Sequence, residues 1–179
     1  MKMTKLSVNI NKIATLRNAR GGDYPNVIQF AIDAERYGAE GITVHPRPDE
    51  RHIKYDDTRA LKEVVSTEFN IEGNPLADPL GEYPGLLSLV EETLPEQCTL
   101  VPDSDSQLTS DHGFDLESQG DRLKPIIAQI KSMGVRVSLF MDPDLEQIKL
   151  ASKVGADRIE LYTGPYAAAW GTEALEAIF

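Results

Sequence analysis

Two histidines and two arginines lie close together after a short apolar segment. Gly41–His45 is followed within seven residues by Arg47, Arg51 and His52. A neutral imidazole both accepts and donates protons near pH 7, and an arginine offers phosphate oxygens a planar fork of donors. The spacing therefore indicates proton transfer beside an anion. A purely structural histidine at the strand end is the alternative that spacing leaves open.

Two carboxylates fall in other apolar segments. Glu72 closes Phe69–Glu72 and precedes Gly73, and Glu160 lies between Ile159 and Leu161. Burial raises the pKa of a carboxyl group, which suits a general base. A structural ion pair is the alternative for both residues, and the basic cluster could supply the partner.

A third polar segment follows the first apolar run. It carries Asn9, Asn11 and Lys12, and then Arg17 and Arg20, which lie three residues apart. In a helical turn these two arginines would project from one side, where they could hold a phosphate. Two surface arginines are the alternative.

Composition limits the class of partner. The net charge of −11 argues against nucleic acid or an anionic membrane. Residues 1–62 nevertheless hold 11 of the 18 Lys and Arg, whereas residues 63–121 hold none. The single Cys98 excludes an intrachain disulfide and a multi-cysteine zinc site, and it is predicted to pack in the core. No spacing of ligands indicates a metal.

Short apolar segments alternate with segments of helical spacing. The predicted strands are Leu6–Ile10, Gly41–His45, Phe69–Glu72, Gln97–Pro102, Arg136–Asp142 and Arg158–Tyr162. Six helical segments are predicted, the last over Tyr166–Phe179. Gly38, Gly134 and Gly155 follow three helices, where glycine adopts the left-handed conformation at little cost.

This strand and helix alternation predicts an α/β fold with a parallel sheet. A doubly wound open sheet that binds a nucleotide would show a Gly-rich turn after its first strand, and Asn9-Ile10-Asn11-Lys12 has none. Polar residues instead follow several strands, as in the (β/α)8 TIM barrel. We therefore expect a single TIM-barrel domain over residues 1–179, with about six of the eight βα units in this chain.

The segment Asn9–Gly21, with its Ile-Ala-Thr-Leu-Arg-Asn-Ala-Arg-Gly core, resembles the N-terminal motif of the pyridoxine 5'-phosphate synthase family. Further segments resemble that family in the same order, namely Gly41–His45 with Arg47, Arg51–Ile53, Leu100–Pro102, Val137–Phe140 and Ile159-Glu160 with Thr163-Gly164. The similarity covers essentially the whole chain.

The resemblance implies a reaction, partners and roles. The family joins 1-deoxy-D-xylulose 5-phosphate to 3-amino-2-oxopropyl phosphate, forming pyridoxine 5'-phosphate, phosphate and water without a metal or organic cofactor. It implies a cytoplasmic homo-oligomer, described as an octamer. His45, Glu72 and Glu160 match its catalytic positions, and its substrate-binding positions match Asn9, Asn11, Lys12, Arg20, Arg47, His52 and Thr109.

Two departures from the family pattern stand out. Many members have Asp-His where this chain has Asn11-Lys12. The family's remaining catalytic histidine and its Gly-rich phosphate-binding segments belong to the last two βα units, which this sequence does not contain. We therefore expect the 179-residue chain to be the N-terminal portion of a synthase and inactive alone. The alternatives are another sugar-phosphate enzyme, such as an isomerase or epimerase, and a non-catalytic scaffold.

Overall fold

Six parallel strands form one sheet whose spatial order follows the chain, in a computed structural model that describes residues 4–104 and 107–177. Each strand pairs in parallel with the next one along the chain. The strands are β1 (Ser7–Asn9), β2 (Gly41–Val44), β3 (Glu68–Gly73), β4 (Gln97–Leu100), β5 (Arg136–Met141) and β6 (Arg158–Leu161).

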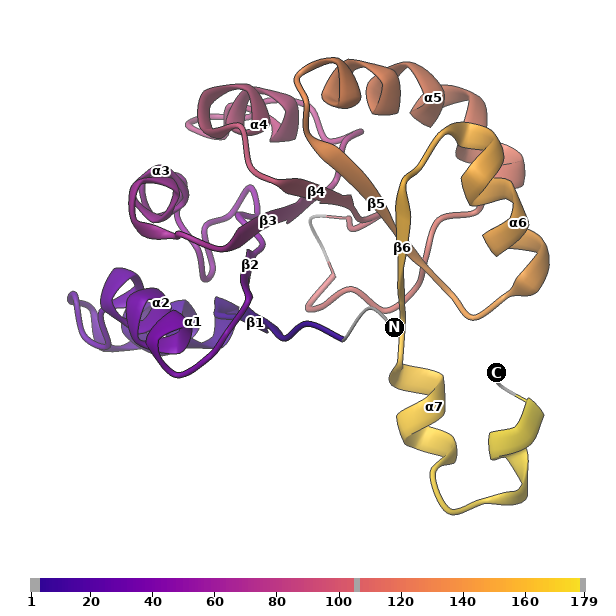
Figure 1. The fold of residues 1–179 in the computed structure, drawn as a ribbon, viewed down its shortest axis with the longest axis horizontal. Helices are drawn as coiled ribbons and strands as arrows, with labels where there is room; N and C mark the ends of the chain where they lie inside the picture. The colour runs from indigo at the N-terminus through magenta and orange to yellow at the C-terminus, as the bar shows by residue number, and fades with distance from the viewer. Residues whose placement is uncertain (1–3, 105–106, 178–179) are drawn as a thin grey trace.

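Helices cover the convex side of this sheet, and the concave side stays open between β1 and β6 (Figure 1). The helices are α1 (Asn11–Arg20), α2 (Val27–Arg36), α3 (Tyr55–Val64), α4 (Leu86–Thr93), α5 (Leu116–Ser132), α6 (Leu145–Val154) and α7 (Gly164–Ala169). Parallel strands in chain order with helices outside are the units of a (β/α)8 barrel. The predicted barrel class is confirmed, with six units present.

Successive strand residues face opposite sides of the sheet, and the two sides differ in polarity. Ile42, Val44 and Ile71 belong to the apolar core and are fully buried. Thr43 and Asn70 are register partners between β2 and β3, and their side chains share a hydrogen bond of 3.3 Å. Apolar residues thus pack against the outer helices, whereas the concave face is polar and can hold catalytic groups.

Two of the predicted glycine turns show why the chain returns to the sheet so sharply. Gly134 and Gly155 follow α5 and α6 with φ of 83° and 96°. These left-handed conformations are unfavourable for other residues. The predicted turns and the burial of Cys98 are confirmed.

Two predictions about helices were wrong. The structure has seven α-helices among the described residues, because α1 forms a separate helix before α2. The final helix predicted over Tyr166–Phe179 is instead divided: α7 ends at Ala169, Gly171 has a φ of 78°, and a 3-10 turn covers Glu173–Ala177. Residues 178–179 lie outside the described part of the chain. This segment extends away from the sheet (Figure 1), so no core selects a continuous helix there.

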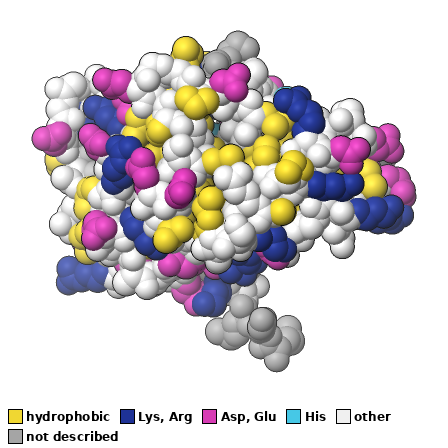
Figure 2. Space-filling model, turned by 90° about the horizontal axis from the view of Figure 1, so that it is seen from above, with side chains coloured by type: hydrophobic (Ala, Val, Ile, Leu, Met, Phe, Trp, Pro, Cys, Tyr) yellow, Lys and Arg dark blue, Asp and Glu magenta, His cyan; other side chains and the backbone are white. Residues whose placement is uncertain are grey.

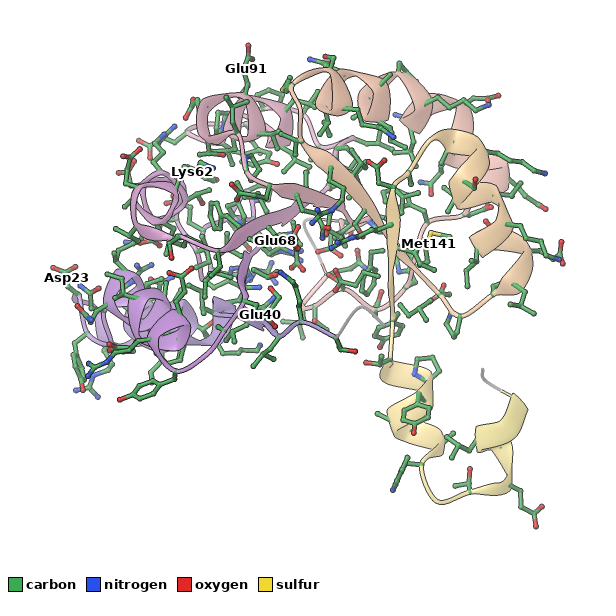
Figure 3. The ribbon with its side chains drawn as sticks, viewed as in Figure 1. Asp23, Glu40, Lys62, Glu68, Glu91 and Met141 are labelled. Carbon is green, nitrogen blue, oxygen red and sulfur yellow. The ribbon has the colours of Figure 1, made fainter. Side chains whose placement is uncertain are left out.

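Acidic and basic side chains alternate over the face shown in Figure 2, with apolar side chains between them. Glu91, on α4, points outward from the molecule, whereas Glu68 lies on the concave side of the sheet (Figure 3). In the described part of the chain, no helix is both long and apolar enough to span a bilayer.

Candidate active site

A cavity of about 510 Å³ lies where the strands end, at the carboxyl edge of the sheet. Four of its side chains come from three strands and the end of a fourth: Asn9 on β1, His45 after β2, Glu72 on β3 and Glu160 on β6. Parallel strands bring these chemically different groups to one edge. Nine of the ten predicted site residues line this cavity, namely Asn9, Asn11, Lys12, His45, Arg47, His52, Glu72, Thr109 and Glu160.

The tenth predicted residue, Arg20, is exposed at the last position of α1 and is not part of the cavity wall. Arg17 is buried instead, and its guanidinium group pairs with Asp57 at 2.5 and 2.8 Å. Both arginines thus lie on one helix, three residues apart as predicted, but in different environments. Arg17 also donates to the carbonyl oxygen of His52 at 3.1 Å, so it holds the loop that carries that histidine.

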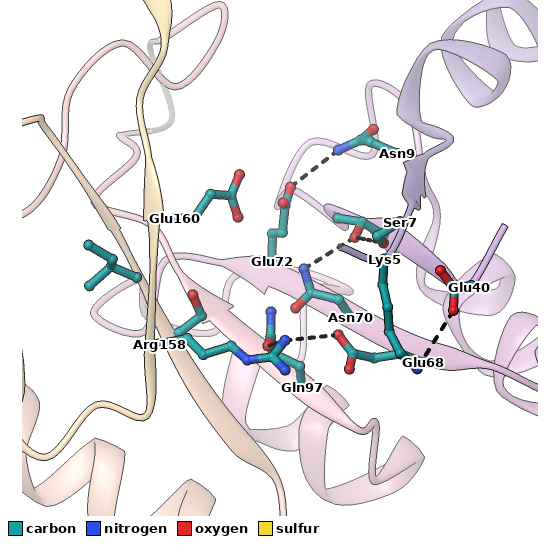
Figure 4. A pocket seen from close by; sticks show the side chains of 13 residues that line it. Lys5, Ser7, Asn9, Glu40, Glu68, Asn70, Glu72, Gln97, Arg158 and Glu160 are labelled. Atoms are coloured by element: carbon teal, nitrogen blue, oxygen red, sulfur yellow. Dashed lines mark hydrogen bonds and ion pairs between the residues drawn. The ribbon is translucent and has the colours of Figure 1, made fainter. Parts of the chain in front are cut away.

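A second cavity of about 780 Å³ follows the concave face toward the other end of the strands. Asn9, Glu72 and Glu160 line both cavities, so the two spaces meet at these side chains. Figure 4 shows Glu72 and Glu160 facing each other across this space. Asn9 donates an amide hydrogen bond to Glu72 at 3.5 Å.

Glu72 combines deep burial with a nearby acid and a nearby imidazole. Only 7% of Glu72 is exposed. Desolvation, followed by the charges of Glu160 and Asp103, raises the pKa of Glu72 well above its ordinary value. Burial also raises the pKa of Glu160. A carboxyl group with a raised pKa keeps its proton to higher pH and is a stronger base once ionised.

His45 is positioned to exchange a proton with Glu72. Its Nδ1 lies 3.8 Å from Oε2 of Glu72. Burial and the neighbouring charge of Arg47 lower the pKa of His45 to about 3, so the ring is neutral at rest. Its backbone N–H donates to the side chain of Asn11 at 2.9 Å, which fixes the end of β2 against the start of α1.

His52 lies beside His45, with the ring centroids 6.1 Å apart. Its Nδ1 accepts the backbone N–H of Ile53 at 2.9 Å, which leaves Nε2 as the protonated nitrogen of the neutral ring. Burial and then Arg47 lower the pKa of His52 to about 4. His52 therefore contributes a neutral N–H donor rather than a charge.

Arg47 and Arg51 hold the loop that follows β4. Arg47 donates to Asp103 at 2.5 Å and to the carbonyl oxygens of Ser104 and Gln107 at 2.9 and 3.0 Å. Arg51 donates to the carbonyl oxygen of Gln107 at 2.8 Å. Because these contacts use the face of Arg47 that would bind an anion, a phosphate group must exchange with loop carbonyls to reach it.

Sequence reasoning missed Asp103 among the site residues, although a signal existed. Asp103 directly follows the predicted strand Gln97–Pro102, and in the structure it lies three residues after β4, which ends at Leu100. Residues 105–106, in the loop that follows Asp103, lie outside the described part of the chain. Among the described residues, no three His, Cys, Asp or Glu side chains are arranged to hold a metal ion.

The fold and the cavity define a (β/α)-barrel protein with buried acid–base groups and nearby cations at the carboxyl ends of its strands. The family model described as "Pyridoxal phosphate biosynthesis protein PdxJ" matches residues 6–179. This chain belongs to that family, as the sequence resemblance predicted.

Relatives with close sequences carry one name. The pyridoxine 5'-phosphate synthase of Xanthomonas campestris pv. campestris (strain B100) is 59% identical over 169 residues, covering 93% of this chain and 66% of that protein. The protein of the same name from Porphyromonas gingivalis is 53% identical over 176 residues, covering 98% and 71%. This chain thus spans 66% of the length of the first of these relatives.

Solved structures with distant sequences share the fold alone. The tryptophan synthase A-subunit of Pyrococcus furiosus matches with a TM-score of 0.59 at 16% identity, covering 97% of this chain and 62% of that one. A thiamine phosphate pyrophosphorylase of the same organism gives 0.53 at 14% identity, covering 92% and 63%.

Proposed function

We propose that the whole protein to which this chain corresponds is a pyridoxine 5'-phosphate synthase. It would condense 1-deoxy-D-xylulose 5-phosphate with 3-amino-2-oxopropyl phosphate. The observation that carries the proposal is the facing pair Glu72 and Glu160, with His45 3.8 Å from Glu72, in a cavity that also contains cationic side chains. The names of the close relatives agree with this chemistry.

The reaction needs several proton transfers at one place. The amine attacks a ketone, water and phosphate leave, and the ring closes and becomes aromatic. Glu72 removes carbon-bound protons and His45 passes protons to departing oxygen, each step being worth about 10²–10⁴-fold in rate. Glu160 offsets the positive charge of nitrogen-containing intermediates.

The phosphate groups of the two substrates require cations and donors. Lys12, Arg47, His52 and Thr109, with Asn11, line the part of the cavity proposed for the deoxyxylulose phosphate. Asn9 is proposed for the aminoketone phosphate. For Arg20 that same role stays a prediction that rests on the resemblance, because the side chain is exposed here.

We further propose a cytoplasmic location and a homo-oligomeric assembly for the whole protein, both from the family. The 179-residue chain is proposed to be inactive alone, since the family's other phosphate-binding segments lie in units beyond β6. A hybrid protein therefore gives the decisive test. In it, residues 1–161 of this chain replace the matching part of the Xanthomonas campestris relative.

The hybrid is incubated with both substrates, and pyridoxine 5'-phosphate is detected by chromatography and mass spectrometry. Product formation that needs both substrates supports the proposal. A folded hybrid that binds both phosphates but forms no product overturns it, and conversion of one sugar phosphate alone would indicate an isomerase or epimerase. The 179-residue chain, assayed in parallel, is expected to give no product.

A further inference from the structure

Asp103 is a buried carboxylate beside the proposed catalytic groups, and only 6% of it is exposed. Its Oδ2 accepts from Arg47 at 2.5 Å and from the hydroxyl of Ser110 at 3.0 Å. Asn74, just after β3, donates to its backbone carbonyl at 2.6 Å and fixes the start of the loop. Asp103 is therefore held in place by the segments that follow β2 and β3.

The carboxylate of Asp103 still has acceptor capacity. Its Oδ1 is buried and has no hydrogen-bond partner among the described residues. A buried oxygen without a donor is costly, so such atoms in native sites usually have a functional reason. The ring of His45 approaches the other oxygen of this carboxylate, because its Nε2 lies 3.6 Å from Oδ2.

His45 consequently stands between two carboxyl groups. Nδ1 faces Glu72 at 3.8 Å, and Nε2 faces Asp103 at 3.6 Å. Both separations exceed a hydrogen bond by only a few tenths of an ångström, and such contacts commonly shorten when substrate binds. A neutral imidazole has one N–H and one bare nitrogen. To hydrogen-bond with both nitrogens, one carboxyl group must accept from the N–H and the other must donate a proton to the bare nitrogen.

The two carboxyl groups do differ. Asp103 faces the guanidinium group of Arg47 and can only accept from the ring while it stays a carboxylate. Glu72 faces Glu160, has no lysine or arginine partner among the described residues, and has a raised pKa, so it can hold a proton to donate. The remaining charged or titratable groups around the ring are Asp49, Arg51, His52 and, from α1, Lys12.

We propose that Asp103 is a positioning residue, which holds the proton of His45 on Nε2 and leaves Nδ1 bare toward Glu72. The proton of the Glu72 carboxyl group can then pass to Nδ1, leaving a glutamate anion as base and an imidazolium ring stabilised by Asp103. After Glu72 has removed a carbon-bound proton, the imidazolium gives its proton to the departing oxygen, so both residues return to their resting protonation states. The catalytic role in this inference rests on the proposed function, whereas the predicted tautomer of His45 rests on geometry alone.

The tautomer of His45 is measurable in the 179-residue chain without substrate. Histidine side chains are labelled with ¹⁵N, and two-bond proton–nitrogen correlations distinguish the protonated ring nitrogen from the bare one. Only three histidines are present, and His45→Gln identifies the signal of His45. At pH 7 we expect the Nε2–H form to exceed the Nδ1–H form by at least about tenfold, as a donor to a charged acceptor should. A dominant Nδ1–H form overturns the proposal, whether or not any variant folds.

Asp103→Asn should shift the ratio by about tenfold or more toward Nδ1–H, because the amide can donate to Nε2. Asp103→Glu should restore the Nε2–H form. The matched control is Asp111→Asn, since exposed Asp111 lies 2.7 Å from Nδ1 of His112, and it should leave the His45 signal unchanged.

An unchanged ratio in folded Asp103→Asn also overturns the inference. The two proposals fail separately. If His45 shows the expected tautomer but the hybrid makes no product, only the proposed function is overturned. If the hybrid makes product but His45 shows the opposite tautomer, only this inference is overturned.

Discussion

The two ends of the concave face differ in how their acidic side chains are paired. Near the amino ends of the strands, Glu68 lies between Arg136 and Arg158, at 2.5 and 3.3 Å. Gln97 accepts from both arginines at 3.0 and 3.2 Å. The acid at this end is paired with two arginines, of which Figure 4 shows Arg158.

At the carboxyl ends, Glu72 and Glu160 face each other with no lysine or arginine paired to either within residues 4–104 and 107–177. Burial raises the pKa of both carboxyl groups, and nearby negative charge raises that of Glu72 further. Paired charges stabilise one end of the interior, whereas the unpaired acids at the other end retain chemical reactivity. The sheet therefore has paired charges at the amino ends of its strands and the proposed catalytic acids at the carboxyl ends.

The largest expected effect comes from Glu72→Gln. In the hybrid protein, kcat should fall about 10²–10⁴-fold because the proposed base is lost. The 179-residue variant should nevertheless be more stable than wild type at pH 8. The folded-state pKa of Glu72 is raised, so the acid costs stability above its unfolded pKa, and the glutamine does not.

Urea unfolding from pH 4 to pH 8 measures this difference. The stability gain of Glu72→Gln should be near zero at pH 4 and should grow by up to about 1.4 kcal/mol per pH unit above the unfolded pKa. A constant difference across the range would show that Glu72 is not perturbed by burial.

Glu68→Gln should show the reverse pattern. We expect a loss of about 1–3 kcal/mol in the free energy of unfolding, because Arg136 and Arg158 lose their charged partner. Affinity for inorganic phosphate should not change. Asp121→Asn is the control, since its ion pair with Lys124 is exposed and worth little. An equal loss of unfolding free energy in both variants would show that the ion pairs of Glu68 contribute no more to stability than the exposed pair of Asp121 with Lys124.

His45→Gln should reduce the loss of unfolding free energy that occurs as the pH falls below neutral. The pKa of His45 is lowered to about 3, below the unfolded value of 6.5. Between these values the unfolded chain binds a proton that the folded chain does not, so stability falls as pH decreases. The variant should reduce this slope by up to about 1.4 kcal/mol per pH unit. Urea unfolding from pH 6.5 to 4.5 tests it, with exposed His112→Gln as control.

The smallest expected effect is on anion binding. Lys12→Gln should weaken binding of inorganic phosphate about fivefold, and added salt should reduce the difference, since Lys12 is exposed at the cavity. Lys5→Gln is matched to it, because Lys5 lines the other end of the interior, 3.9 Å from Glu40. Isothermal titration calorimetry that gives equal losses for both would contradict a phosphate site at the carboxyl end.

Strand-terminal residues were the most predictable part of the site. His45 and Glu72 end apolar runs, and strand ends of a parallel sheet meet at one edge whatever the details of packing. Arg17 could not be predicted in the same way. Its partner Asp57 is 40 residues away, and only the packing of α3 against α1 decides that Arg17 is buried while Arg20 is exposed.

Local pattern by itself determined the alternation of strands and helices, the glycine turns and the residue types at the strand ends, because these depend on backbone preference and on period. Family membership also followed from the sequence. Tertiary structure alone decided that Arg47 binds the loop after β4, that Asp103 faces His45 and that Glu72 lies opposite Glu160. These contacts join distant segments, and desolvation and Coulomb interaction depend on distances that no local pattern contains.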